Sequence, residues 1–151
     1  MHKLDKLYKQ LDQYSDFNKN NNDENFLQIA DEIVAYNNPG SLKVLLKYFN
    51  DEESSWVLEI LKGIIKSSNY LDDFNFSKEI LSNLYILFPH AKEWARSFLY
   101  IIFNETYCYQ ILKQNIHLAD LKSFNELLDL MWEESEEHRP QIEELRKLIN
   151  K

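Results

Sequence analysis

Two stretches of the chain carry the same pattern of bulky apolar residues, separated by 38 positions. The matched positions are Trp56, Ile60, Leu61, Ile64 and Ile65 in the first stretch and Trp94, Phe98, Leu99, Ile102 and Phe103 in the second. Residues 42–49 and 80–87 echo each other in the same way. Because each stretch has the length and the three-and-four spacing of a helix, the repeat predicts stacked helical hairpins, which usually form binding surfaces.

The same spacing along the whole chain predicts an all-α fold of about nine helices, stacked as antiparallel hairpins in the HEAT or armadillo manner. Polar or proline-containing segments separate the helices, such as the asparagine run at 18–22. The expected helices cover residues 4–14, 23–36, 41–49, 54–67, 77–88, 90–103, 107–116, 120–131 and 140–149.

Short side chains with an oxygen atom mark the expected helix starts, because that oxygen can accept a hydrogen bond from a backbone N–H group of the first turn. The candidate N-caps are Asp23, Ser41, Ser54 or Ser55, Ser77 and Asp120. Pro89 and Pro140 suit the first turn of the sixth and ninth helices, where the N–H group that proline lacks would have no helical partner.

Composition agrees with a helical fold. The chain has 151 residues, 44% of them hydrophobic, which is enough for a single globular domain. Only two glycines and three prolines are present, whereas a β-sandwich needs many turns rich in these residues. We therefore expect one helical domain over residues 1–151, with an N-terminal helical hairpin at 1–37 and stacked repeats at 41–151.

Signals that direct a protein out of the cytoplasm are not found in the sequence. No apolar signal-peptide region follows Met1, and no window approaches 18 consecutive apolar residues. The single cysteine, Cys108, cannot form an internal disulfide and fits a reducing compartment. We expect a cytoplasmic protein that does not span a membrane.

Side chains suited to catalysis or metal binding are sparse. The four histidines are His2, His90, His117 and His138. None has a second histidine four residues away or a glutamate three residues before it, so helical zinc and di-iron motifs are missing. A buried thiol is more often a small apolar residue than a nucleophile, so an enzyme built on Cys108 and His117 is the alternative ranked last. We expect no enzymatic activity, no metal and no cofactor.

The chain carries a net charge of −8 and has a sequence pI of about 5.0. That field repels nucleic-acid phosphates and attracts a basic partner, although solubility alone is the simpler explanation. The acidic residues cluster at 50–53, at 72–73 and between Asp120 and Glu144. Acidic patches of this kind speed docking onto a basic target.

Tryptophan side chains pack in cores and also anchor interfaces. Trp56 and Trp94 begin the repeated stripes and are expected in the core, whereas Trp132 lies beside the densest acidic run and is a candidate interface residue. The candidate partner-binding residues are Asp51, Glu52, Glu53, Glu59, Asp72, Asp73, Trp132, Glu133, Glu134, Glu136 and Glu137.

Several segments carry a family likeness. They are the apolar stripe of residues 42–49, the acidic corner Asp51 to Glu53 followed by Trp56, Pro89 with Trp94-Ala95, the run from Ile102 to Asn104, and the final helix that Pro140 leads. With them the region from Ser41 to Ile149 resembles a family of all-α, HEAT-like immunity proteins from bacterial polymorphic toxin systems of the contact-dependent inhibition type.

The resemblance implies a non-enzymatic antidote that binds the toxic C-terminal domain of a cognate effector in the producing cell. It implies neutralisation by covering the toxin's active site or by blocking a rearrangement that the toxin needs. Many such toxins are nucleases with basic grooves, which an acidic surface would fit. The alternative is a general helical-repeat adaptor that binds a peptide or helix of a partner protein, and a neighbouring toxin gene would separate the two.

Overall fold

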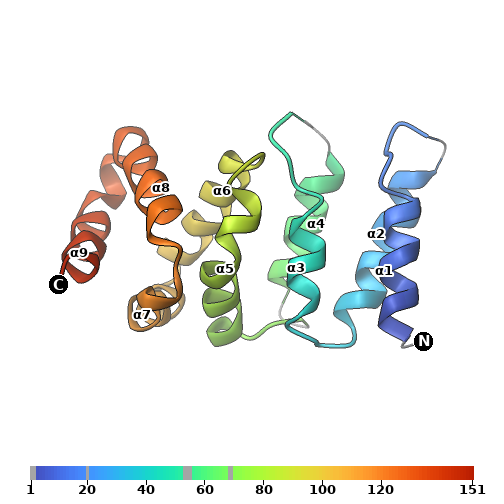
Figure 1. The fold of residues 1–151 in the computed structure, drawn as a ribbon, viewed down its shortest axis with the longest axis horizontal. Coiled ribbons are helices and arrows are strands. Elements are labelled where there is room, and N and C mark those ends of the chain that lie inside the picture. Colours follow the sequence, from blue (N-terminus) through green and yellow to red (C-terminus); the bar gives the residue numbers. More distant parts are fainter. Residues whose placement is uncertain (1–2, 20, 53–55, 68–69) are drawn as a thin grey trace. The chain divides into compact units, whose positions relative to one another are not determined.

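Nine α-helices and two 3₁₀ helices make up the regular structure of residues 3–19, 21–52, 56–67 and 70–151, which are the residues that the computed structural model describes (Figure 1). No strand occurs in these ranges, so the predicted all-α class is confirmed. The helices are α1 (Lys3–Gln13), α2 (Asn22–Val34), α3 (Ser41–Leu46), α4 (Trp56–Lys66), α5 (Asp73–Leu87), α6 (Lys92–Phe103), α7 (Thr106–Gln114), η1 (Ile116–Leu118), α8 (Leu121–Glu134), η2 (Glu136–His138) and α9 (Arg139–Ile149).

The chain divides into two units, each of which is described by itself. The N-terminal unit comprises residues 1–49 and 53–72, and the C-terminal unit comprises residues 50–52 and 73–151. The corner at 50–52 therefore belongs with helices that follow it by some forty residues, and not with α3 or α4 on either side of it. The single domain and the continuous HEAT-like stack remain predictions.

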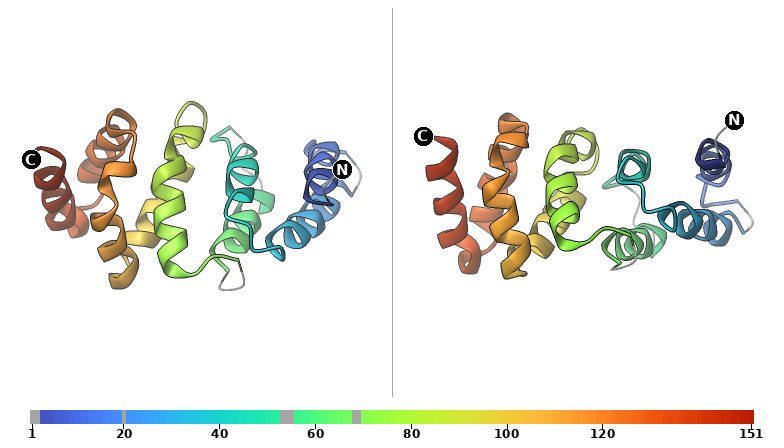
Figure 2. Two further views of the ribbon diagram at one scale, coloured as in Figure 1. Left: turned by 60° about the horizontal axis from the view of Figure 1, so that its bottom comes forward. Right: turned by 90° about the horizontal axis from the view of Figure 1, so that it is seen from below.

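In the N-terminal unit, α2 is the central helix. It packs against α1, α3 and α4, and α1 and α3 form one layer while α2 and α4 form the other (Figure 2). The apolar stripes account for this arrangement, since Leu7 and Leu11 of α1 and Phe26 and Ile33 of α2 are all buried. The helix expected over residues 23–36 is shorter than predicted: α2 ends at Val34, and Tyr36 beyond its end is 41% exposed.

In the C-terminal unit, α5 and α6 hold the core. Helix α5 packs against α6, α7, α8 and η1, and α6 also packs against α7 and α8. Because α5 has neighbours on several sides, its buried residues are spread around its axis and do not form one stripe. Phe76, Phe98 and Phe124, from three of these helices, are fully buried.

Some expected helix starts are confirmed. Asp120 occupies the N-cap position of α8, although its carboxylate accepts a hydrogen bond from the Ser123 hydroxyl at 3.0 Å and not from the backbone. Pro140 lies in the first turn of α9, as predicted. The candidate caps Ser54 and Ser55 lie outside the described residues.

Other expected starts were wrong. Asn21, with φ of 59°, occupies the N-cap of α2, and Asp23 lies within the first turn. Ser41 is already the first residue of α3, and its buried hydroxyl shares a 2.6 Å hydrogen bond with the Tyr8 hydroxyl of α1. Pro89 lies in the turn before α6, because that helix begins only at Lys92.

Ser77 was the most misleading of the expected caps. Helix α5 begins at Asp73, where an acidic side chain suits the positive end of the helix dipole, so Ser77 lies inside the helix. The earlier start also lets Phe76 join Ile80 and Leu84 on the buried side at four-residue spacing. The Ser77 hydroxyl is buried and has no hydrogen-bond partner among the described residues.

The repeat predicted from the sequence holds for helix formation but not for burial. Trp56 was expected in the core and is 53% exposed, and Ile60 is 43% exposed while its counterpart Phe98 is fully buried. Trp94, the counterpart of Trp56, is half-buried. Within its unit α4 packs against α2, whereas α6 packs against three helices, so the same stripe is covered in one unit and partly uncovered in the other.

We predict that Ser77→Ala stabilises the protein by about 1 kcal/mol, because the substitution removes a buried hydroxyl without a partner and places a better helix former in α5. Ser41→Ala is the matched control: it removes an equally buried hydroxyl that is hydrogen-bonded to Tyr8, and it should destabilise. Urea unfolding of both variants measures the two effects, and a loss of stability in Ser77→Ala would contradict the assignment.

Candidate partner-binding surfaces

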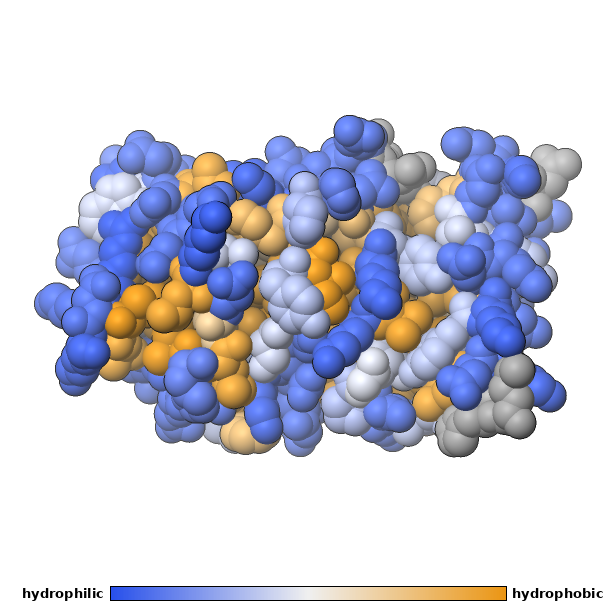
Figure 3. Space-filling view, viewed as in Figure 1, coloured by the Kyte–Doolittle hydropathy of each residue, from blue (hydrophilic) through white to orange (hydrophobic). Residues whose placement is uncertain are grey.

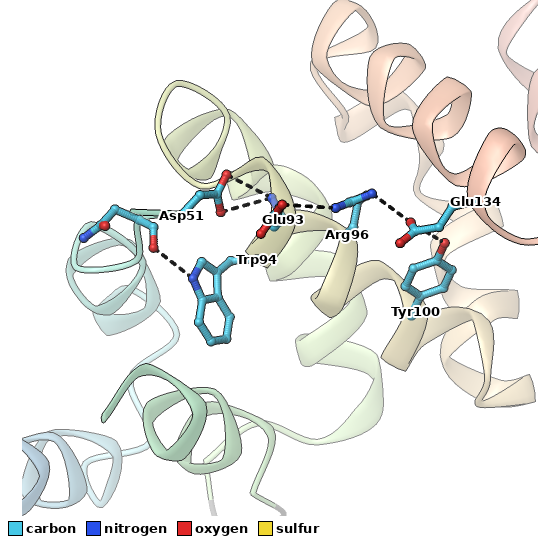
Figure 4. Close-up of polar contacts among 7 residues, drawn as sticks. Asp51, Glu93, Trp94, Arg96, Tyr100 and Glu134 are labelled. Carbon is cyan, nitrogen blue, oxygen red and sulfur yellow. Dashed lines mark hydrogen bonds and ion pairs between the residues drawn. The ribbon is translucent and has the colours of Figure 1, made fainter. Parts of the chain in front are cut away.

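The corner at 50–52 supplies the N-terminal cap of α6. The carboxylate of Asp51 accepts hydrogen bonds from the backbone N–H of Glu93 at 3.1 and 3.2 Å, and the backbone N–H of Asp51 donates to the His90 carbonyl at 2.8 Å (Figure 4). The indole N–H of Trp94 donates to the Asn50 carbonyl at 3.0 Å. Because the N-cap position of α6 provides no side-chain acceptor, Asp51 supplies one for the Glu93 N–H of its first turn from a distant part of the sequence.

A polar chain continues from this cap along α6 to the end of α8. Arg96 lies 3.7 Å from the carboxylate of Glu93 and 2.8 Å from that of Glu134, to which Tyr100 also donates a hydrogen bond at 3.0 Å (Figure 4). Burial, followed by this bond and the charge of Glu134, raises the pKa of Tyr100 to about 12. Glu134, a predicted contact residue, therefore ties α8 to α6.

Trp132 lies beneath two guanidinium groups. The side chains of Arg139 and Arg146 lie 5.0 and 5.3 Å from its ring centre, and Arg139 also donates a hydrogen bond to the Trp132 carbonyl at 2.9 Å. Arg146 forms an ion pair with Asp129. Stacking of this kind stabilises the junction of α8 and α9, so Trp132 has a structural role whether or not a partner reaches it.

His138 fixes the same junction from inside. It is buried, with Nδ1 2.8 Å from the Ser135 hydroxyl and Nε2 2.8 Å from the side-chain oxygen of Asn104. Its ring also packs between Tyr100 and Phe103. The 3₁₀ helix η2 is thereby attached to the end of α6, which sets where its two glutamates project.

Six predicted contact residues of the C-terminal unit are exposed. Asp51 and Glu134 make the contacts described above, and the other four are Glu52, Glu133, Glu136 and Glu137. Glu136 is 89% exposed and lies 4.0 Å from Arg139. The acidic excess is concentrated in this unit, which contains fifteen Asp and Glu against nine Lys and Arg, whereas the N-terminal unit contains ten against eight.

The other predicted contact residues do not join this group. Glu59 is on α4 of the N-terminal unit and forms an ion pair with Lys62 at 3.1 Å. Asp72 is the last residue of that unit and Asp73 the first residue of α5. Glu53 lies outside the described residues. The eleven residues therefore do not form one patch within either unit, and their role in binding stays a prediction.

A partly buried cluster in the C-terminal unit connects α7 to α9. The Tyr109 hydroxyl donates to the Glu144 carboxylate at 2.6 Å, and the Lys113 ammonium lies 3.1 Å from the same oxygen. The hydrogen bond from Tyr109 and then the contact with Lys113 lower the pKa of Glu144. Burial, followed by the contact with Glu144, raises the pKa of Tyr109.

The two residues considered as a catalytic pair, Cys108 and His117, differ in their exposure to solvent. Cys108 is fully buried in α7, and His117 is exposed in η1. Among the described residues no group of three or more His, Cys, Asp and Glu side chains is arranged to hold a metal ion.

A groove that the sequence reasoning missed lies between α2 and α4 of the N-terminal unit. Its volume is about 550 Å³, within the range of small-molecule and side-chain binding sites. It is lined by Asp31, Val34, Ala35, Ile60, Gly63, Ile64 and Ser67. Most of this lining is apolar or small, so the groove can accept an apolar side chain.

Gly63 was the signal that could have revealed the groove. It lies inside α4, where glycine costs about 1 kcal/mol relative to alanine. A Cβ added there would meet no atom within 4 Å, so no contact in the described structure requires this position to be a glycine. An unexplained glycine within a helical stripe therefore coincides with the floor of the groove.

The C-terminal unit has an apolar surface of its own. Figure 3 shows hydrophobic side chains gathered on the part of one face formed by α7 and the beginning of α8. Leu121 is 44% exposed there, and Ile116 and Leu118 of η1 are partly exposed. Each unit thus has an exposed surface that includes apolar side chains: the α2–α4 groove in the N-terminal unit and the surface of α7 and α8 in the C-terminal unit.

Comparison with known proteins gives one match. The model of the family described as Immunity protein 30 matches residues 13–112, a range that includes α2, the groove and the whole of α6. No curated protein and no solved structure matches the chain.

Among the described residues no helix has the length and apolar character needed to cross a membrane.

We predict that Asp51→Ala lowers the free energy of unfolding by about 1–2 kcal/mol, because α6 loses the acceptor that satisfies its first turn. Asp51→Asn keeps a side-chain oxygen and should lose less. Glu52→Ala, at the exposed neighbouring position, is the control and should change stability by under about 0.5 kcal/mol. Urea unfolding and amide hydrogen exchange of α6 measure these effects, and equal stability of all three variants would contradict the capping role.

We predict that Tyr109→Phe raises the pKa of Glu144 toward 4.5 and lowers stability at pH 7 by about 1 kcal/mol. Since folding lowers the pKa of Glu144, its contribution is complete above the unfolded pKa and is lost as pH falls through the folded pKa. The variant should therefore lose less stability on acidification than the wild type. Carboxyl NMR titration and urea unfolding at pH 7 and pH 3 test this, with the exposed Tyr107→Phe as the control.

Proposed function

Since the chain belongs to the Immunity protein 30 family, we propose that it neutralises a toxin by binding the toxic domain of its cognate effector and covering the surface that this domain needs. The observation that carries the proposal is the family match over residues 13–112, about two-thirds of the chain. Protection then comes from binding and not from catalysis. We place this binding in the cytoplasm of the producing cell.

The distribution of charge supports a basic toxin surface as the target. The C-terminal unit contains most of the acidic excess, and a nuclease groove is a common basic surface of this kind. Glu136 and Glu137 project from η2 and are exposed. Asp51 and Glu134, by contrast, already satisfy groups of the fold, so the residues of η2 are the better candidates for steering the toxin.

A general helical-repeat adaptor is the second candidate, and the groove between α2 and α4 is the observation that favours it. Grooves of this kind accept a peptide or an amphipathic helix. Co-expression with the toxin gene next to the gene for this chain separates the two functions. Survival of the cells and co-purification of the two proteins support immunity, and death of the cells with no complex overturns it.

We predict that Glu136→Lys with Glu137→Lys slows association with the toxin domain about 10-fold at low salt and changes dissociation little, because long-range charge acts mainly on the association rate. Asp5→Lys with Glu24→Lys makes the same change in net charge on exposed positions of the N-terminal unit and should slow association less. Stopped-flow kinetics with a catalytically inactive toxin domain, at two salt concentrations, measure the difference. Equal rates for both pairs would remove η2 from the docking surface.

A further inference from the structure

Apolar side chains extend the α2–α4 groove along α4. Trp56, Ile60 and Ile64 follow one another at four-residue spacing, so they share a face of the helix with Gly63. Trp56 is 53% exposed and Ile60 is 43% exposed. A contiguous exposed apolar surface next to a hollow is typical of a protein-binding site.

Gly63 lines the groove without a side chain. With no side chain on Gly63, the backbone of α4 is bare at the groove, and an added Cβ would enter open space. Glycine at such a position lets another backbone or a bulky side chain approach closely. No contact within the described structure requires the glycine, so this position of the groove is open to an incoming side chain.

Asp31 supplies the charge that defines the occupant. It is the charged residue among those that line the groove, it is exposed, and it forms no ion pair with any described residue. A carboxylate beside an apolar hollow is complementary to a segment that carries an apolar side chain next to Lys or Arg. That chemistry agrees with the net charge of −8, which favours a basic partner.

We propose that the α2–α4 groove binds a segment of the cognate toxin domain, with an apolar side chain of that segment against Ile60 and Gly63 and a Lys or Arg beside Asp31. The proposal rests on the proposed function and adds the surface through which the toxin is held. The acidic C-terminal unit then sets the rate of encounter, while the groove of the N-terminal unit sets the lifetime of the complex.

Gly63→Ala and Gly63→Leu test the groove, because their effects on the fold and on binding have opposite signs. Gly63→Ala should raise the midpoint of thermal unfolding by about 2–4 °C, since alanine favours the helix and meets no atom. The same variant should weaken binding of the inactive toxin domain about 10-fold, and Gly63→Leu should weaken it about 100-fold, mainly through faster dissociation. Gln110→Leu, on the exposed side of α7, is the control for an added apolar side chain and should bind as the wild type does.

Asp31→Asn and Asp31→Lys test the charge. Both should weaken binding, the second more, and both should reduce its dependence on salt. Failure of the wild type to bind the toxin domain overturns the proposed function. Wild-type binding that Gly63→Leu and Asp31→Lys leave unchanged overturns the groove alone. A homodimer that Gly63→Leu dissociates would assign the groove to a second copy of the chain and would also overturn it.

Discussion

The cap that Asp51 places on α6 fixes the start of the helix around which the C-terminal unit packs. Helix α6 packs against α5, α7 and α8, so its position sets that of the helices around it. Its N-terminus has no capping side chain of its own, and unpaired N–H groups at a partly buried helix end are costly. The carboxylate of Asp51 accepts from one of them, the N–H of Glu93, and brings the corner at 50–52 into the unit.

This role changes how the acidic residues of the chain are understood. An acidic corner in a sequence looks like a surface for a partner, yet the carboxylate of Asp51 is committed to the backbone of α6 and that of Glu134 to Arg96 and Tyr100. The glutamates of η2 have weaker commitments, since Glu136 is 89% exposed and its ion pair is 4.0 Å long. Carboxylates committed to the fold and carboxylates left exposed therefore lie close together in sequence and differ in their partners.

The helical class, the number of helices and the starts of α8 and α9 could be predicted, because three-and-four spacing, aspartate caps and first-turn prolines are local signals. The start of α5 was missed because Ser77 looked like a cap, although the Phe76 spacing already extended the stripe. The exposure of Trp56 could not be predicted, because a stripe shows which side of a helix is apolar and not how many helices cover it. Both the Asp51 cap and the groove join residues far apart in sequence, and only Gly63 gave a local hint of the groove.

The three indoles of the chain lie in different surroundings. Trp94 is half-buried and hydrogen-bonded, Trp132 lies beneath two guanidinium groups, and Trp56 is more than half exposed, one turn before Ile60. An indole in water emits at longer wavelengths than one screened from it. In the steady-state fluorescence of the unlabelled protein, Trp56 therefore contributes the emission at the longest wavelength. A molecule that excludes water from this edge of α4 would shift that emission toward the blue.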